Sequence, residues 1–252
     1  MTASLLAGAT LKARVVARRG GVIYGLQPAR LACAMVDPAL SFRALVRDGA
    51  SLTAGEAAAE IEGLAASVVT AERTALNFLT HLSGVATLTR AYVTAVEGTG
   101  ARIAATRKTL PGLRLLQKAA VVAGGGLPHR FGLGDAVLIK DNHIAAAGGV
   151  GPALTRARDA AGHMRVVEVE VDSLAQLEEA LAHGPDCVLL DNFTLGDLRA
   201  AVALANGRVT LEASGGVSLE TVRAIAETGV HVISVGALTH SAPALDLGLD
   251  AA

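Results

Sequence analysis

The stretch VVEVEVDSLAQLEEALAHGPDCVLLDNFTLGDLRAAVALANGRVTLEAS (Val166–Ser214) decides the predicted fold. It contains three short apolar runs, at Val166–Val171, Cys187–Asp191 and Val209–Ala213, and a helical pattern separates each run from the next. Strands that alternate with helices form a parallel sheet covered by helices, because parallel neighbours need a long crossover connection. This stretch therefore predicts an α/β fold.

The same alternation continues in both directions along the chain. The further predicted strands are Arg102–Thr106, Ala136–Lys140 and Val230–Val235. The predicted helices are Leu113–Ala123, Val150–Ala161, Leu174–His183, Leu195–Ala205 and Leu219–Thr228. Successive crossovers of one hand close a barrel, but about six strands fall short of a complete barrel of eight. An open, incomplete α/β barrel therefore fits better than a doubly wound sheet, for which a GxGxxG after the first strand is missing.

The part of the chain before this alternation predicts a small α+β domain. Leu11–Arg18 and Gly21–Gly25 are expected to form a hairpin-like pair of strands. Gln27–Val36 predicts a helix that ends before Pro38, whereas Ser41–Val46 and Glu56–Gly63 predict strands.

A long helix is expected to follow, with Thr70 as its N-cap and a bend or break at Ser83-Gly84. We place the domain boundary in this region. The prediction is an N-terminal α+β domain at 1–84 and an open barrel at 85–252, with the last residues packing back on the first domain.

Composition excludes several classes of function. A net charge of −1, 2% aromatic residues and no Trp argue against a nucleic-acid surface. No apolar run reaches the roughly 20 residues of a membrane span, and Met1–Leu11 lacks the pattern of a signal peptide. The chain is therefore expected to be cytoplasmic. Cys33 and Cys187 lie far apart without metal-binding spacing, so we expect two reduced thiols.

Cationic side chains gather in two neighbouring stretches, AATRKTLPG (Ala104–Gly112) and GGGLPHRFGLGDAVLIKDNHI (Gly124–Ile144). These stretches contain two of the chain's four lysines. Their candidate site residues are Arg107, Lys108, His129, Arg130 and Lys140. Such a local concentration in a nearly neutral chain indicates a site for an anionic small molecule, most simply one that carries phosphates.

Polar and small residues also recur where predicted strands end. Lys140, Glu170 and Asp191 each lie at or near such an end, and Ser214-Gly215-Gly216 and Gly236 follow two late strands. The carboxyl ends of parallel strands are where active sites of α/β folds collect. The Gly-containing turns suit backbone contacts to a phosphate, although ordinary tight turns would have the same composition.

The acidic members of this group allow two interpretations. Glu168 and Glu170 point to the same side of their strand, because side chains alternate along a strand. They are either part of a structural ion-pair network with Lys140 and Arg107 or part of a ligand site. Asp191, at the end of a separate strand, favours Mg²⁺ shared with a phosphate-bearing substrate.

Several ordered blocks of the chain resemble quinolinate phosphoribosyltransferases. The blocks are ERTALNFLTHLSGVATLT (Glu72–Thr89), TRKTLPGLR (Thr106–Arg114), GGGLPHRFGLGDAVLIKDNHI, VEVEVDSL (Val167–Leu174), LLDN (Leu189–Asn192), LEASGGV (Leu211–Val217) and ISVGALTHS (Ile233–Ser241). The resemblance implies a type II phosphoribosyltransferase fold. It also implies conversion of quinolinate and phosphoribosyl pyrophosphate, with Mg²⁺, to nicotinate mononucleotide, pyrophosphate and CO₂ in de novo NAD synthesis.

The resemblance also implies roles for individual residues. Arg107, Arg130 and Lys140 would hold the pyridine dicarboxylate, and Lys108, His129 and Lys140 would face the pyrophosphate. Glu170 and Asp191 would contact the ribose and Mg²⁺, and with Lys140 they are the candidate catalytic residues. Ser214, Gly215 and Gly236 would bind phosphate. Arg73 would reach the substrate of a neighbouring subunit in a homodimer or larger assembly.

Two departures from the family pattern keep alternatives open. The family's first helical segment, with an EDxGxGD-like stretch, is expected to be missing, since the chain begins MTASLLAGAT. Pro128 stands where the family usually has Asn, as in related proteins associated with molybdenum transport. The alternatives are therefore a paralogue that acts on another anionic substrate and a non-catalytic binding protein.

Overall fold

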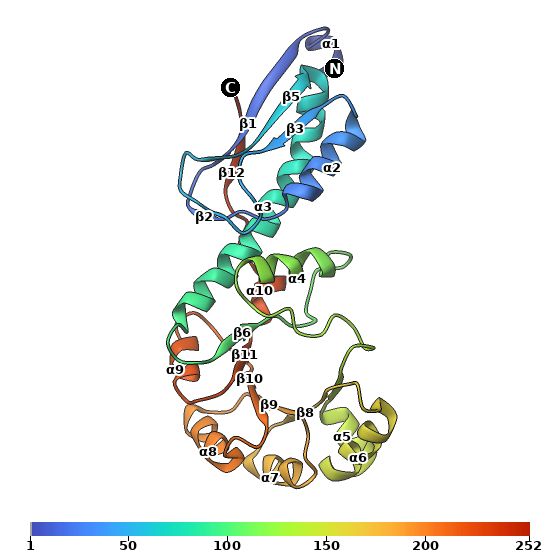
Figure 1. Cartoon of the computed structure of the whole chain (residues 1–252), viewed down its shortest axis with the longest axis vertical. Coiled ribbons are helices and arrows are strands. Elements are labelled where there is room, and N and C mark those ends of the chain that lie inside the picture. The colour runs from blue at the N-terminus through green and yellow to red at the C-terminus, as the bar shows by residue number, and fades with distance from the viewer. Residues whose placement is uncertain (1) are drawn as a thin grey trace. The chain divides into compact units, whose positions relative to one another are not determined.

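The computed structural model describes residues 2–252, and Met1, with which the predicted first domain begins, lies outside the described residues. The chain divides into two compact units (Figure 1). The first comprises Met1–Arg90, as far as it is described, with Leu110–Gly125 and Ala237–Ala252, and the second comprises Ala91–Thr109 and Gly126–Gly236. The domain boundary at residue 84 stays a prediction.

An antiparallel sheet with the strand order β12-β1-β5-β3 forms the frame of the first unit. Its strands are β1 (Thr10–Ala17), β3 (Ser41–Ala44), β5 (Ala57–Leu64) and β12 (Leu247–Ala251). The helices with residues in this unit are α1 (Thr2–Leu5), α2 (Leu26–Val36), α3 (Ala65–Ala95), α4 (Arg114–Ala123) and α10 (Ala237–His240). Alternate residues of β1, such as Val15, enter a core of buried Ala, Val, Leu and Ile side chains from this sheet and from α2 and α3.

Two expectations for the first unit were wrong. The predicted hairpin does not form, because β2 (Gly21–Val22) pairs with β4 (Ser51–Leu52) and β1 pairs with β5 and β12. The long helix α3 begins at Ala65, and Thr70 lies within it, where its hydroxyl donates to the carbonyl of Ala66 instead of capping a helix start.

The second unit contains a six-stranded sheet with the order β6-β11-β10-β9-β8-β7. Its strands are β6 (Arg102–Ala104), β7 (Val137–Ile139), β8 (Val167–Val171), β9 (Cys187–Asp191), β10 (Thr210–Ser214) and β11 (Val232–Ser234), and all their pairings are parallel. Every predicted strand of this region is therefore confirmed. Strands β7 to β11 follow one another in space as they do in sequence, which is the order of an open barrel and not of a doubly wound sheet.

Helices cover the outer side of this sheet in Figure 1. They are α5 (Asp141–Ala147), α6 (Val150–Ala161), α7 (Leu174–Ala182), α8 (Leu195–Ala205) and α9 (Val222–Ala226). Helix α5 was not expected from the sequence. It begins directly after Lys140, whose backbone N–H donates to Nδ1 of His143 at 2.9 Å.

Among residues 2–252, no helix has both the length and the apolar character of a membrane span.

Candidate active site

A cavity of about 460 Å³ lies in the second unit at the carboxyl ends of its strands. Its lining residues are Thr106, Arg107, Lys108, His129, Arg130, Leu133, Leu138, Lys140, His143, Glu170, Leu189, Asp191, Glu212, Ser214 and Ser234. Because all six strands are parallel, residues that end different strands meet at one edge of the sheet. The prediction that charged side chains gather at strand ends is thus realised as one cavity.

The cationic lining comes from the end of β6 and from the loop before β7. Arg107 and Lys108 follow β6, and Leu127 is tied to that strand by its N–H to the carbonyl of Ile103 at 2.8 Å. This tie brings the following residues His129 and Arg130 to the same cavity. Burial lowers the pKa of the Arg130 guanidinium, and the neighbouring charge of Arg107 lowers it further. A bound anion would relieve this repulsion.

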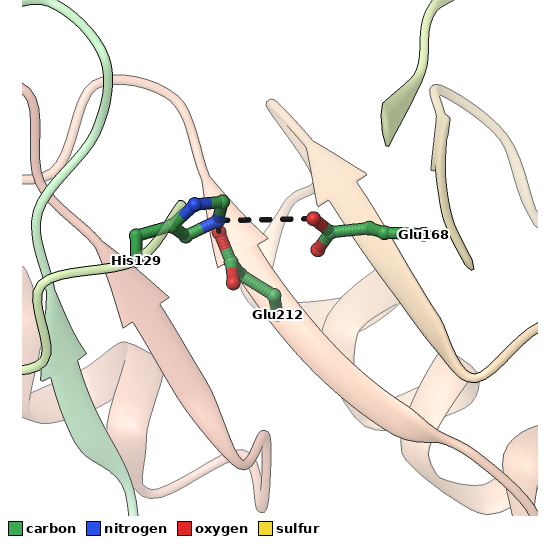
Figure 2. Close-up of side chains that lie close together, drawn as sticks. All are labelled: His129, Glu168 and Glu212. Carbon is green, nitrogen blue, oxygen red and sulfur yellow. Dashed lines mark ion pairs between the residues drawn. The ribbon is translucent and has the colours of Figure 1, made fainter. Parts of the chain in front are cut away.

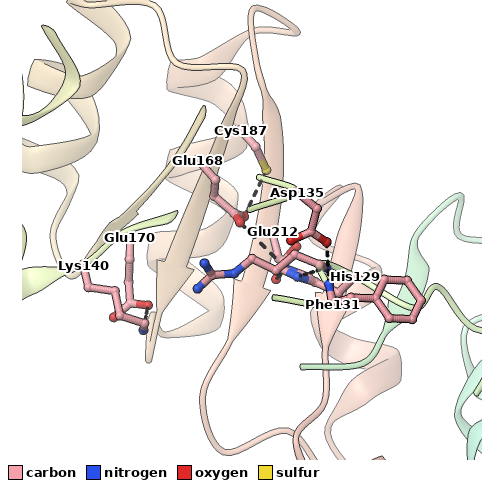
Figure 3. A network of polar contacts seen from close by, with 9 residues as sticks. His129, Phe131, Asp135, Lys140, Glu168, Glu170, Cys187 and Glu212 are labelled. Carbon is pink, nitrogen blue, oxygen red and sulfur yellow. Dashed lines mark hydrogen bonds and ion pairs between the residues drawn. The ribbon is translucent and has the colours of Figure 1, made fainter. Parts of the chain in front are cut away.

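Lys140 and Glu170 form a direct ion pair at the ends of the neighbouring strands β7 and β8. In Figure 3 this pair lies apart from the carboxylates around His129. Asp191 ends β9, and its carboxylate accepts a hydrogen bond from the side chain of Asn192 at 2.8 Å. The cavity therefore joins an acidic part to the cations described above.

His129 lies between two buried carboxylates that rise from β8 and β10 (Figure 2). Its Nε2 is 3.3 Å from Oε1 of Glu212 and 3.7 Å from Oε2 of Glu168. Burial, followed by the charge of Glu212, raises the pKa of Glu168 to about 7, and His129 partly opposes this shift. The Cys187 thiol donates to Glu168 at 3.3 Å, and burial raises its pKa, so it is a reduced and unreactive group.

The loop between His129 and β7 is closed by Asp135. Its carboxylate accepts the backbone N–H groups of Phe131 at 2.5 Å and Gly132 at 3.1 Å (Figure 3). These bonds, that of Phe131 most, lower the pKa of Asp135, which therefore stays ionised. The turn places Leu133, an apolar side chain, at the lining of the cavity.

Eight of the eleven predicted substrate residues line this cavity: Arg107, Lys108, His129, Arg130, Lys140, Glu170, Asp191 and Ser214. Gly215 directly follows β10, and Gly236 follows β11, but neither belongs to the lining. Arg73 lies on α3 in the first unit, where its side chain is exposed. Their roles stay predictions.

The sequence interpretation missed Glu212, which is 4% exposed and lines the cavity. One signal was available, because Glu212 stands two residues before Ser214 and thus shares its side of β10. Thr106, Leu133, Leu138, Leu189 and Ser234 were also not predicted as lining residues. They are polar or apolar without charge, so nothing in their type marks them.

Two sets of side chains have the composition of a metal site. His129, Glu168 and Glu212 bring ligand atoms within 4.8 Å of one another, but Nδ1 of His129 also accepts the backbone N–H of Arg130 at 2.7 Å. Glu170 and Asp191, the predicted Mg²⁺ ligands, line both the main cavity and an adjoining pocket that Asp141 and Asp172 also line. Carboxylates at such an edge fit Mg²⁺, which prefers oxygen ligands and substrate phosphates.

An open α/β barrel whose strand ends surround one cavity with cations and carboxylates defines a class, that of barrel enzymes acting on anionic small molecules. Comparison with known proteins is more specific. The models of the N-terminal and C-terminal domains of quinolinate phosphoribosyl transferase match residues 1–83 and 85–250.

A nicotinate-nucleotide pyrophosphorylase [carboxylating] of Mycobacterium leprae is 49% identical over 98% of this chain and 89% of that protein. The crystal structure of NadC from Streptococcus pyogenes matches with a TM-score of 0.93 and 41% identity, over 100% of this chain and 90% of the other. That of nicotinate-nucleotide pyrophosphorylase from Ehrlichia chaffeensis gives 0.95 and 37%, over 100% and 91%. The chain belongs to the quinolinate phosphoribosyltransferase family.

Proposed function

We propose that the chain transfers the phosphoribosyl group of phosphoribosyl pyrophosphate to the ring nitrogen of quinolinate and releases CO₂. The products are nicotinate mononucleotide, pyrophosphate and CO₂, a step of NAD biosynthesis. The observation that carries this proposal is the cavity, in which two guanidinium groups and two lysines meet two carboxylates at the strand ends. Relatives of 40–49% identity over nearly the whole chain carry the names of this activity.

The cations suit two different anions. A guanidinium is a planar fork that binds carboxylates in pairs, so Arg107 and Arg130 suit the two carboxylates of the pyridine ring. Lysine is a compact point charge, and Lys108 and Lys140 suit a pyrophosphate leaving group. Ser214, at the end of β10, is placed for a phosphate contact together with the backbone of Gly215 and Gly236.

The carboxylates suit the transition state. Transfer of a ribosyl group develops positive charge on the sugar, and Glu170 and Asp191 line the cavity where they can stabilise it. Both residues would also hold Mg²⁺, which supplies further neutralisation of the pyrophosphate when bound. After transfer the ring nitrogen is a quaternary cation, which accepts the electron pair left by the departing carboxylate as CO₂.

The test is a turnover assay with the purified chain, phosphoribosyl pyrophosphate and Mg²⁺. With quinolinate we expect equal amounts of CO₂ and nicotinate mononucleotide, and with nicotinate no comparable product. Lys140→Ala removes one cation of the cavity and should lower kcat/KM by about 100-fold or more. A folded protein without quinolinate turnover would refute the proposal in favour of a paralogue or a binding protein.

We further propose that the enzyme is a homodimer or larger assembly in which Arg73 completes the site of a neighbouring subunit. This arrangement comes from the family resemblance, and Arg73 is exposed on α3 as such a role requires. The cytoplasmic location expected from the sequence also stays a prediction.

A further inference from the structure

The ring of His129 is held at both of its nitrogens. Its Nδ1 accepts the backbone N–H of Arg130 at 2.7 Å, and its Nε2 lies 3.3 Å from Oε1 of Glu212. A nitrogen that accepts an N–H carries a lone pair, so the ring proton sits on Nε2 and is donated to the carboxylate. This tautomer makes His129 a link between a strand and a loop.

The strand end of this link is rigid. Glu212 lies in the middle of β10, where its backbone pairs with Leu189 of β9 and with Val232 of β11. Its side chain is 5% exposed. Glu168 is the weaker of the two carboxylate partners, since its oxygen is 3.7 Å from Nε2 and it also accepts from Cys187.

The loop end of the link needs such support. His129 has a φ of 53°, in the left-handed region that residues with a side chain rarely adopt. A non-glycine residue keeps this conformation when its surroundings determine it. The next residue, Arg130, lines the cavity close to the like charge of Arg107, so its guanidinium would move away from Arg107 if the loop were free.

We infer that Glu212 is a positioning residue, which through the His129 ring holds the backbone of Arg130 so that its guanidinium faces the pyridine dicarboxylate. The inference rests on the proposed function, because it assigns the ligand of Arg130. It changes the predicted role of His129. The imidazole is a neutral strut that holds Arg130, whereas the sequence interpretation had it face the pyrophosphate as a cation.

The test compares Glu212→Gln with Glu212→Ala. A glutamine oxygen accepts the Nε2–H of His129 without a charge, and alanine leaves it without a partner. We expect Glu212→Gln to stay near the wild type. We expect Glu212→Ala to raise KM for quinolinate by about tenfold or more, with KM for phosphoribosyl pyrophosphate within about twofold of the wild type. Thr210→Ala, at an exposed position of the same strand, is the matched control.

Two results would overturn the inference. If Glu212→Gln is as defective as Glu212→Ala, the carboxylate charge and not the hydrogen bond is required, and His129 acts as a cation. If Glu212→Ala changes both KM values equally, or neither, Glu212 does not act through Arg130.

A second variant covers the case that Glu212→Ala does not fold. His129→Asn keeps a residue that tolerates the left-handed backbone but is too short to reach Glu212. It should show the same selective rise of KM for quinolinate, and an unchanged KM would contradict the inference. Absence of quinolinate turnover in the wild type would refute the proposed function instead, so the two failures are distinguishable.

Discussion

Gly215 shows how a residue without a side chain shapes the site. Its φ is 96°, and a Cβ at this position would stand 2.1 Å from Oδ1 and 2.9 Å from the backbone nitrogen of Asn192. Asn192 in turn donates to Asp191, a predicted catalytic residue. The close approach of these two strand ends therefore depends on glycine.

We expect Gly215→Ala to lower the free energy of unfolding by about 1–3 kcal/mol, from strain and from the displaced Asn192. Activity should fall further than stability explains, because Asp191 moves with Asn192. Gly216→Ala is the control, since its φ of 57° is also left-handed but its Cβ would meet nothing within 4 Å. Urea unfolding and steady-state assays measure both effects. Equal losses in the two variants would show that the contact with Asn192 does not matter.

At the scale of elements, the long helix α3 contains a glycine that its sequence pattern marks as a break. The helix continues through Ser83-Gly84 without interruption. A Cβ on Gly84 would stand 2.1 Å from the carbonyl oxygen of Pro243, so glycine here serves close packing of the C-terminal segment. The two atoms belong to the same compact unit.

Gly84→Ala should therefore destabilise the protein by about 2 kcal/mol or more, against the usual gain from alanine in a helix. Gly196→Ala in α8 is the matched control, because its nearest contact would be an ordinary 3.6 Å to the Thr194 side chain. We expect it to be neutral or stabilising by up to about 1 kcal/mol. The measurement is thermal or urea unfolding of both variants. A Gly84→Ala protein as stable as Gly196→Ala would exclude the packing argument.

The sheet of the first unit contains an acid surrounded by cations. Glu60 is buried on β5 and contacts Lys12 at 3.0 Å, Arg14 at 3.3 Å and Arg43 at 2.9 Å. The hydrogen bond from Arg43, followed by that from Lys12, lowers the pKa of Glu60 from 4.5 to about 2. A lowered pKa in the folded state stabilises the protein above the unfolded value, and this contribution disappears as protons bind at lower pH.

We therefore expect Glu60→Gln to be less stable than the wild type at neutral pH, with the difference shrinking as pH falls from about 4.5 to 2. Added salt should also reduce it, because the three cations are about half exposed. Glu62→Gln, on the same strand but 57% exposed, should change stability by no more than about 0.5 kcal/mol. Urea unfolding at several pH values measures this. A difference that grows towards low pH would refute the assignment.

The sequence predicted best what depends on local pattern. The six strands of the second unit were found because apolar runs such as Cys187–Asp191 are bounded by turns and helices. The start of α3 was missed because Thr70 has the composition of a cap, whereas packing against the sheet extends the helix back to Ala65. Likewise, β2 chose β4 over its neighbour β1 through long-range pairing that no local signal encodes. The clustering of Lys140, Glu170 and Asp191 followed from strand ends, but the contact of Glu212 with His129 required coordinates.

At the scale of the whole molecule, the first unit is assembled from three separate segments of the chain. Its C-terminal strand β12 pairs antiparallel with β1 over the register Ala13–Ala251 to Ala17–Leu247, so both ends of the chain belong to one sheet (Figure 1). The second unit holds the cavity. Arg73 belongs to the first unit and Lys140 to the second, so a shared site between subunits can be tested by changing one residue of each unit.

The shared site makes a quantitative prediction for mixed subunits. Arg73→Ala and Lys140→Ala should each be inactive, because every site lacks one cation. In a dimer that contains one of each, one site loses both cations and the other retains both. After exchange of equal amounts, half of the dimers are mixed, so about a quarter of the wild-type activity should return. Coexpression with two affinity tags isolates the mixed dimer, whose activity should be about half that of the wild type. If isolated mixed dimers stay inactive while Arg73→Ala remains folded and dimeric, Arg73 does not act across the interface, and its predicted role in a neighbouring site is wrong.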